Sequence, residues 1–205
     1  MKNKSFYLIL ALVLLLPVII LSQKKSPKDL PDRYRKWLEE EVVYIITPKE
    51  KDVFLQLQTD REREMFMEAF WNQRDPNPNT PENEFKEEHY RRIKYADQTF
   101  GRESPGPGWR TERGRIYITL GEPKMIERYE HDSEIYPTII WFYEGMIEFG
   151  LPNAFNVVFF KRSGTGEYEL YSPIRFGPQH LLIDFKGDPM DYAAAYRQLL
   201  RIDPT

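Results

Sequence analysis

The spacing of apolar side chains changes beyond a loop at residues 101–108 and divides the chain into two halves. Before the loop, apolar residues recur every three or four positions, as at Ile93, Ala96 and Phe100, a period typical of amphipathic helices. After it, alternation at 116–120 and apolar runs at 138–143, 155–161 and 167–171 predict strands. The first half is therefore expected to be helical and the second half a sheet.

Capping residues mark where the helices should begin. Thr47-Pro48 and Thr80-Pro81 each place a capping hydroxyl before proline at the first helical position. Thr59 and Glu62 have the spacing of a capping box. The helix that starts there should bury Met65, Phe66, Ala69 and Phe70.

Three further segments complete the expected fold. Residues 42–46 fit either a strand or a buried turn of helix, and their β-branched content favours a strand. Glycines at 144–145 and 163–166 indicate hairpin turns, and a last helix is expected over 189–201. The order of elements predicts an α+β fold with N-terminal helices packed on one face of an antiparallel β-sheet meander, and a short C-terminal helix.

The N-terminus has the pattern of an export signal. Lys2 and Lys4 precede a 16-residue apolar core at 6–21. As a helix this core spans about 24 Å, short of a ~30 Å hydrocarbon layer, which favours a cleaved signal peptide over 1–22. The large Ile20 near the boundary favours the alternative, a retained signal anchor. A polar linker at 23–30 and a single domain at 31–205 should follow.

The composition limits which cellular compartment and which classes of binding partner we expect. The net charge is −3, with both signs interleaved along the chain, so no basic surface for nucleic acid is expected. There is no cysteine, which excludes disulfides and a lipidated N-terminal cysteine. We expect an exported protein, periplasmic or membrane-anchored in the cell envelope, that meets the membrane only through its N-terminal segment.

Three motifs occur in a fixed order along the chain. They are YIITPKEKDVFLQL at 44–57, FWNQRDPNPNTPENEFKEEHYRRIKYADQTFG at 70–101 and GWRTERGRIYITLGEP at 108–123. Together they resemble the bacterial GWxTD domain family over roughly residues 34–150. The resemblance implies a cell-envelope setting and supplies no known reaction.

The motif that names the family falls on Gly108, Trp109, Thr111 and Glu112. Glutamate stands where the family has aspartate. A glutamate closes a tight turn on its own backbone poorly, and its carboxylate would be displaced by about 1 Å, a shift that can cost ~100-fold in catalysis. The exchange therefore favours a structural role for this position.

The same stretch has two interpretations. As structure, it launches the strand expected at 116–120, and Trp109 fills a pocket between the helices and the sheet. As function, its charges form a lip beside the stiff RDPNPNTPENE run at 74–84, which an Arg74–Asp75 ion pair orders. The candidate binding surface comprises Arg74, Asp75, Trp109, Arg110, Glu112 and Arg113.

The sequence offers little for catalysis. The three histidines fit no HExxH pattern, and His89 lies on an apolar stripe, as expected for a hydrogen-bonded core residue. No GxSxG elbow or phosphate loop is present, so no metal site or cofactor is expected. A carboxylate pair, Asp75 with Glu112, is the alternative, an envelope glycan hydrolase with Trp71 and Trp109 as sugar platforms.

The apolar runs WFY and VVFF favour an interaction domain. Consecutive apolar residues in a strand mean that both sheet faces are covered or that one face meets a partner. We expect a non-catalytic interaction or scaffold domain with a protein partner in the envelope. A third interpretation is a domain that only supports a further C-terminal module.

Overall fold

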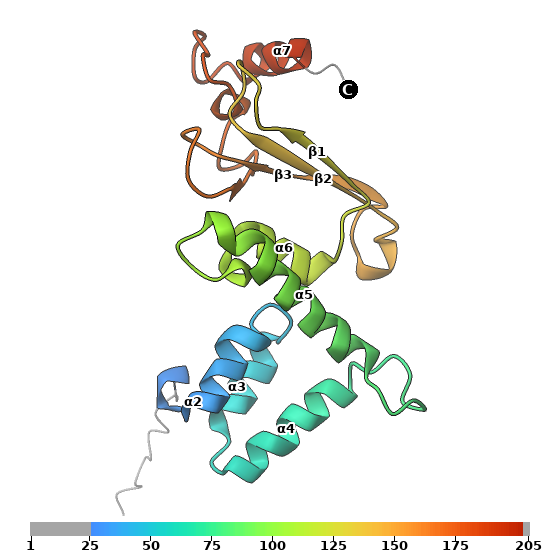
Figure 1. Ribbon diagram of the computed structural model, residues 1–205. Coiled ribbons are helices and arrows are strands. Elements are labelled where there is room, and N and C mark those ends of the chain that lie inside the picture. The colour runs from blue at the N-terminus through green and yellow to red at the C-terminus, as the bar shows by residue number, and fades with distance from the viewer. Residues whose placement is uncertain (1–25, 203–205) are drawn as a thin grey trace, which may run out of the picture.

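The computed structural model describes residues 26–202, so the predicted signal segment lies outside the described residues. Helices α2 (Asp32–Lys36), α3 (Pro48–Gln56), α4 (Asp60–Asn72) and α5 (Glu84–Phe100) come first. The turn η4 (Gly108–Arg110) and helix α6 (Glu112–Leu120) then lead into strands β1 (Met125–Tyr129), β2 (Thr138–Glu144), β3 (Ala154–Phe160) and β4 (Glu169–Leu170). Helix α7 (Tyr192–Ile202) is last. The predicted α+β class is confirmed (Figure 1).

The N-terminal helices form their own apolar cluster. Trp37, in the π-helical turn η2 (Trp37–Glu41) that follows α2, is buried, and its ring lies 4.9 Å from Phe54 and 5.3 Å from Phe70. Leu30, which the sequence placed in the linker, is only 4% exposed and belongs to the same cluster. Leu30 is thus part of the packed core. Among residues 26–202, no helix has both the length and the hydrophobicity of a membrane span.

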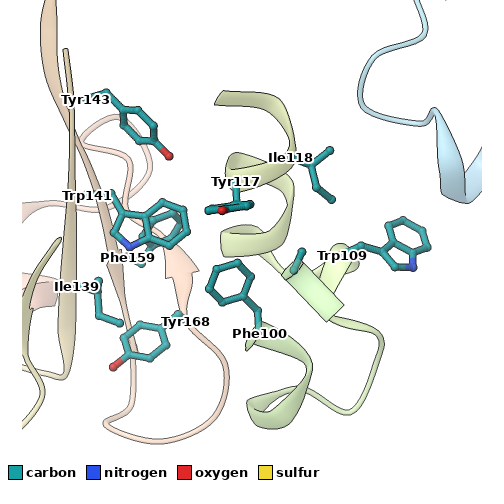
Figure 2. Packing of buried hydrophobic residues seen from close by; sticks show 10 residues of the cluster. Phe100, Trp109, Tyr117, Ile118, Ile139, Trp141, Tyr143, Phe159 and Tyr168 are labelled. Atoms are coloured by element: carbon teal, nitrogen blue, oxygen red, sulfur yellow. The ribbon is translucent and has the colours of Figure 1, made fainter. Parts of the chain in front are cut away.

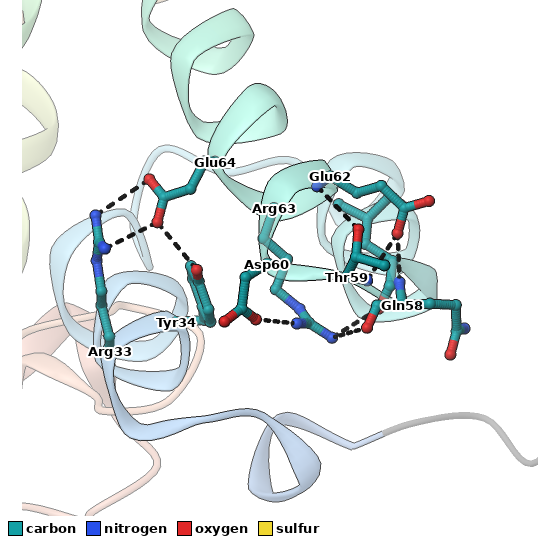
Figure 3. A network of polar contacts seen from close by, with 9 residues as sticks. Arg33, Tyr34, Gln58, Thr59, Asp60, Glu62, Arg63 and Glu64 are labelled. Carbon is teal, nitrogen blue, oxygen red and sulfur yellow. Dashed lines mark hydrogen bonds and ion pairs between the residues drawn. The ribbon is translucent and has the colours of Figure 1, made fainter.

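The predicted caps of α3 and α4 are present. The Thr59 side chain accepts a hydrogen bond from the Glu62 amide at 3.2 Å, and the Glu62 carboxylate accepts one from the Thr59 amide at 2.8 Å (Figure 3). Thr47 and Glu50 form the same box at the start of α3. Each box satisfies backbone donors that have no partner inside the helix.

Two details of the predicted helices are wrong. Helix α5 begins after Asn83, whose side chain accepts from the Lys86 amide at 2.8 Å, and not at Thr80. In α4, Met65 and Ala69 are exposed, because the buried stripe is displaced toward Phe70 and Trp71. Both residues of that displaced stripe pack against the N-terminal cluster.

Helix α5 joins the two halves. At its N-terminal end, His89 is buried and Tyr90 packs on the N-terminal cluster; at its C-terminal end, Ala96 and Phe100 belong to the core under the sheet. Figure 1 shows α5 between helices α2–α4 and the sheet. Helix α5 therefore packs in both clusters and fixes their relative position.

The sheet is the predicted meander, with strand order β1-β2-β3-β4 and antiparallel neighbours. Alternate residues of β2 point to opposite faces. Ile139, Trp141 and Tyr143 pack toward α5 and α6, and Ile140 and Phe142 point away. We call the second face the outer face.

The strand predicted at 116–120 is wrong, since these residues form the second half of α6. The alternation of Ile116 and Ile118 suggested a period of two, but the buried positions Gly114, Tyr117 and Ile118 follow a helical spacing. Thr111 supplies the helix cap. The first strand is β1, which starts several residues later.

The strand favoured at 42–46 is also wrong. The segment is a turn in which the amides of Ile45 and Ile46 both donate to the Val42 carbonyl at 2.9 Å. Val42 is fully buried, so burial and not strand pairing accounts for the β-branched residues. The structure thus has the buried turn that the sequence left open.

Helix α7 lies beside the outer face of the sheet. It buries Ala195, and Leu199 and Ile202 pack beside Ile135 and Leu182. Its Leu200 lines a hollow together with outer-face residues of the sheet. Helices α5 and α6 cover one face, and α7 borders the other.

Candidate functional site

The GWRTERG turn is closed by a threonine. The Thr111 hydroxyl donates to the Gly108 carbonyl at 2.8 Å and accepts from the Gly114 amide at 2.9 Å. Both bonds are buried. They fasten η4 to the first turn of α6, so Thr111 performs the turn-closing task that an aspartate at 112 would otherwise be expected to share.

Two glycines allow this turn to pack against its neighbours. A Cβ on Gly108 would lie 2.0 Å from the Ala96 carbonyl oxygen of α5, and a Cβ on Gly114 would lie 2.0 Å from the Gly108 carbonyl oxygen. No side chain fits at either place. The backbones of α5, η4 and α6 are therefore in direct contact.

Trp109 lies on the side of α6 away from the sheet, beside the N-terminal helices (Figure 2). Its amide donates to the Asp97 carboxylate at 3.0 Å, and its carbonyl accepts from the Tyr44 hydroxyl at 3.0 Å. The side chain is 7% exposed. The predicted pocket between helices and sheet is instead filled by Phe100 and Tyr117, which face Trp141.

Arg113 is the buried charge of the motif. Its guanidinium lies over the rings of Phe100 at 5.0 Å and Tyr168 at 4.4 Å, and it pairs with Glu103 at 3.0 Å. Only 8% of its side chain is exposed. A charge held this way joins the helix layer to the segment before β4 and is not available to a partner.

Arg110 and Glu112 are the residues of this stretch that reach the surface. Arg110 is exposed, with its guanidinium 4.8 Å from the Trp109 ring. Glu112 begins α6 and forms an ion pair with Arg115, three residues later. A carboxylate at this place stabilises the helix through the dipole whether it belongs to aspartate or glutamate, which explains why the exchange is accommodated.

Arg74 and Asp75 have partners of their own. Arg74 contacts Glu50 at 2.8 Å and lies 3.7 Å from the Phe70 ring, while Asp75 accepts from the Asn77 amide at 3.0 Å. Their loop precedes α5 and the GWRTERG turn follows it. Arg74 also donates to the Ile45 carbonyl at 3.4 Å, and the adjacent Tyr44 donates to the Trp109 carbonyl. The structure divides the six predicted surface residues into two groups, Arg74 and Asp75 in one loop and the other four at η4 and the start of α6.

His89 occupies the predicted core position. Its Nε2 lies 2.6 Å from the Glu41 carbonyl oxygen, and Tyr90 donates to the Glu41 carboxylate at 2.6 Å. Burial lowers the pKa of His89, so the ring is neutral at pH 7. Within residues 26–202, no three His, Asp or Glu side chains are placed to hold a metal ion.

A groove on the outer face was not located by the sequence. It has a volume of about 390 Å³ and lies between the sheet and α7. Its floor is built from cross-strand neighbours, Met125 beside Phe142 and Glu127 beside Ile140. Leu200 of α7, 58% exposed, contributes to the wall. The consecutive apolar residues of β2 and β3 were the signal for it.

The family assignment rests on a match of the GWxTD domain model to residues 20–176. The chain belongs to the GWxTD domain family. No curated protein and no solved structure matches it. In this GWxTD domain, the sheet floor of the groove lies inside the matched region, and α7 follows the region's last residue.

Proposed function

We propose that this chain is a non-catalytic interaction or scaffold domain of the cell envelope, exported through its N-terminal segment. The observation that carries the proposal is the internal use of the motif. Gly108, Trp109, Thr111 and Arg113 all contact other parts of the same chain. A motif occupied in this way serves to hold a surface in shape and not to bind a reacting group.

The arrangement of carboxylates gives the hydrolase alternative no support. Two glycosidase carboxylates must face one substrate bond about 5–10 Å apart. Asp75 and Glu112 instead have separate local partners, since Asp75 accepts from the Asn77 amide and Glu112 is paired with Arg115. Trp109, the expected sugar platform, is buried.

Photo-crosslinking in the native cells tests the proposal. A photo-reactive amino acid replaces Arg110, which is exposed beside Trp109, and adducts are identified by mass spectrometry. A second variant carries the probe at Met65, which is 60% exposed on α4, and searches a different part of the surface for the same partner. Discrete adducts with one envelope protein are the expected result.

The enzyme alternative makes a different prediction. If Glu112→Gln abolishes the cellular phenotype of the chain while the variant stays folded, and no protein is labelled from any exposed position, the interaction proposal is wrong. A retained phenotype in Glu112→Gln removes the carboxylate mechanism, because glutamine keeps the shape of glutamate but cannot carry its charge or proton.

A further inference from the structure

The outer-face groove has the character of a docking site and not of a solvated sheet face. A sheet face that meets water normally alternates with polar residues. Here the apolar Met125, Ile140, Phe142 and Val158 outnumber the polar Glu127, Thr138 and Asn156 on the floor of the groove, and Met125 is 49% exposed. The apolar residues continue onto α7 through Leu200, so floor and wall form one surface.

One charge lies within this apolar floor. Glu127 is half-buried beside Ile140, and among residues 26–202 it pairs with no cation. It accepts a long hydrogen bond, 3.4 Å, from the Tyr129 hydroxyl. A carboxylate in this position is complementary to a lysine or arginine that arrives with an apolar neighbour.

Helix α7 shows which kind of element this face accepts. It presents Ala195, Leu199 and Ile202 to Ile135 and Leu182 at one end of the sheet. Its flank toward the hollow carries Tyr196 and Leu200, which are 49% and 58% exposed. Helices pack side by side at about 8–10 Å, so a second helix laid next to α7 would cover both this flank and the floor.

We infer that the groove binds an amphipathic helix of a partner protein, with its apolar stripe on Phe142, Val158 and Leu200 and a lysine or arginine paired with Glu127. The inference rests on the proposed interaction function and names its surface and the chemistry of its partner. The apolar contacts supply affinity, and the single charge selects the orientation and excludes acidic helices.

The test uses photo-reactive amino acids at three positions of the full chain in native cells. Positions 125 and 200 line the groove from floor and wall. Position 126 is the control, since Ile126 is 41% exposed but points to the opposite face of the same strand. Positions 125 and 200 should label one partner segment at sites spaced three or four residues apart, and position 126 should label it at least about tenfold less.

Charge exchange then tests the role of Glu127. Glu127→Arg should reduce the adduct at position 200 at least about tenfold, and Glu148→Arg, an exposed acidic position outside the groove, should not. Replacement of the paired lysine or arginine in the labelled partner segment by glutamate should restore the adduct with Glu127→Arg. Failure of this restoration overturns the assigned pair.

Other results separate the inference from the proposed function. Labelling from position 110 but not from 125 or 200 refutes the groove and leaves the interaction function standing. Adducts to a second copy of the chain, or to its own residues 6–21, refute a partner helix as the occupant. Absence of protein adducts at every position refutes both.

Discussion

The substitution Gly114→Ala tests whether close packing of the turn outweighs the higher helix propensity of alanine. In an exposed helix, replacement of glycine by alanine stabilises by about 1 kcal/mol. In α6, the added Cβ would lie 2.0 Å from the Gly108 carbonyl oxygen and 3.0 Å from the Trp109 Cα. Sequence propensity and packing thus predict opposite signs for the same substitution.

The size of the effect follows from what can move. The Gly108 carbonyl would have to retreat by more than 1 Å, but Gly108 is itself pressed against the Ala96 carbonyl of α5. Overpacking costs about 1–3 kcal/mol, and a clash with backbone on both sides belongs at the upper end. After the helical gain, the net loss should be about 2 kcal/mol, or roughly 4–8 °C in Tm.

Urea unfolding followed by tryptophan fluorescence measures this loss, with Gly106→Ala as the matched control. A Cβ on Gly106 would meet nothing closer than the Ser104 hydroxyl at 3.9 Å, so that variant should stay within about 0.5 kcal/mol of wild type. If Gly114→Ala is as stable as wild type, the contact between η4 and α6 is looser than described, and the motif loses its structural role.

Three further substitutions test other parts of the account. Thr59→Ala should cost about 1 kcal/mol in urea unfolding through loss of the α4 cap; an unchanged midpoint would contradict the capping box. Trp109→Ala should cost about 3–5 kcal/mol because the side chain is buried; a stable variant that binds no partner would place Trp109 at a working surface. Hydrogen bonds from Arg91, and then from Arg92, lower the pKa of Glu88 from 4.5 to about 2. That stabilisation is present above pH 4.5 and is lost as the pH falls toward 2, so Glu88→Gln should lose less stability than wild type over this window; parallel losses would contradict the assignment.

Local signals in the sequence were sufficient for the starts of α3 and α4 and for strands β2 and β3. The box of Thr59 and Glu62 needs only residues three apart, and the β2 and β3 runs predict strands from their own composition. The strand predicted at 116–120 is wrong because the alternation of Ile116 and Ile118 was taken as a period of two, whereas the residues lie in α6. The position of Gly114 in a helix depends on Gly108 lying against it, a contact that no short-range pattern encodes.

The candidate site was predicted least well where partners are distant in sequence. Arg74 pairs with Glu50, 24 residues earlier, and not with adjacent Asp75. Arg113 is buried between Phe100 and Tyr168, although a charged residue in a glycine-rich stretch is normally exposed. The groove needs β1, β2, β3 and α7 together, so the sequence could indicate an apolar face but not its position.

Native-state hydrogen exchange at residues 108–115 tests whether the GWxTD motif of this chain is a buried, structural contact that holds α5, η4 and α6 together. The Trp109 amide donates to Asp97 and the Gly114 amide to Thr111. Both should exchange as slowly as amides of α5 and β2, because exposing these two amides requires the N-terminal cluster to separate from the core under the sheet. Rapid exchange at these two amides, with α5 and β2 still protected, would show that the turn is an open loop and would contradict the account.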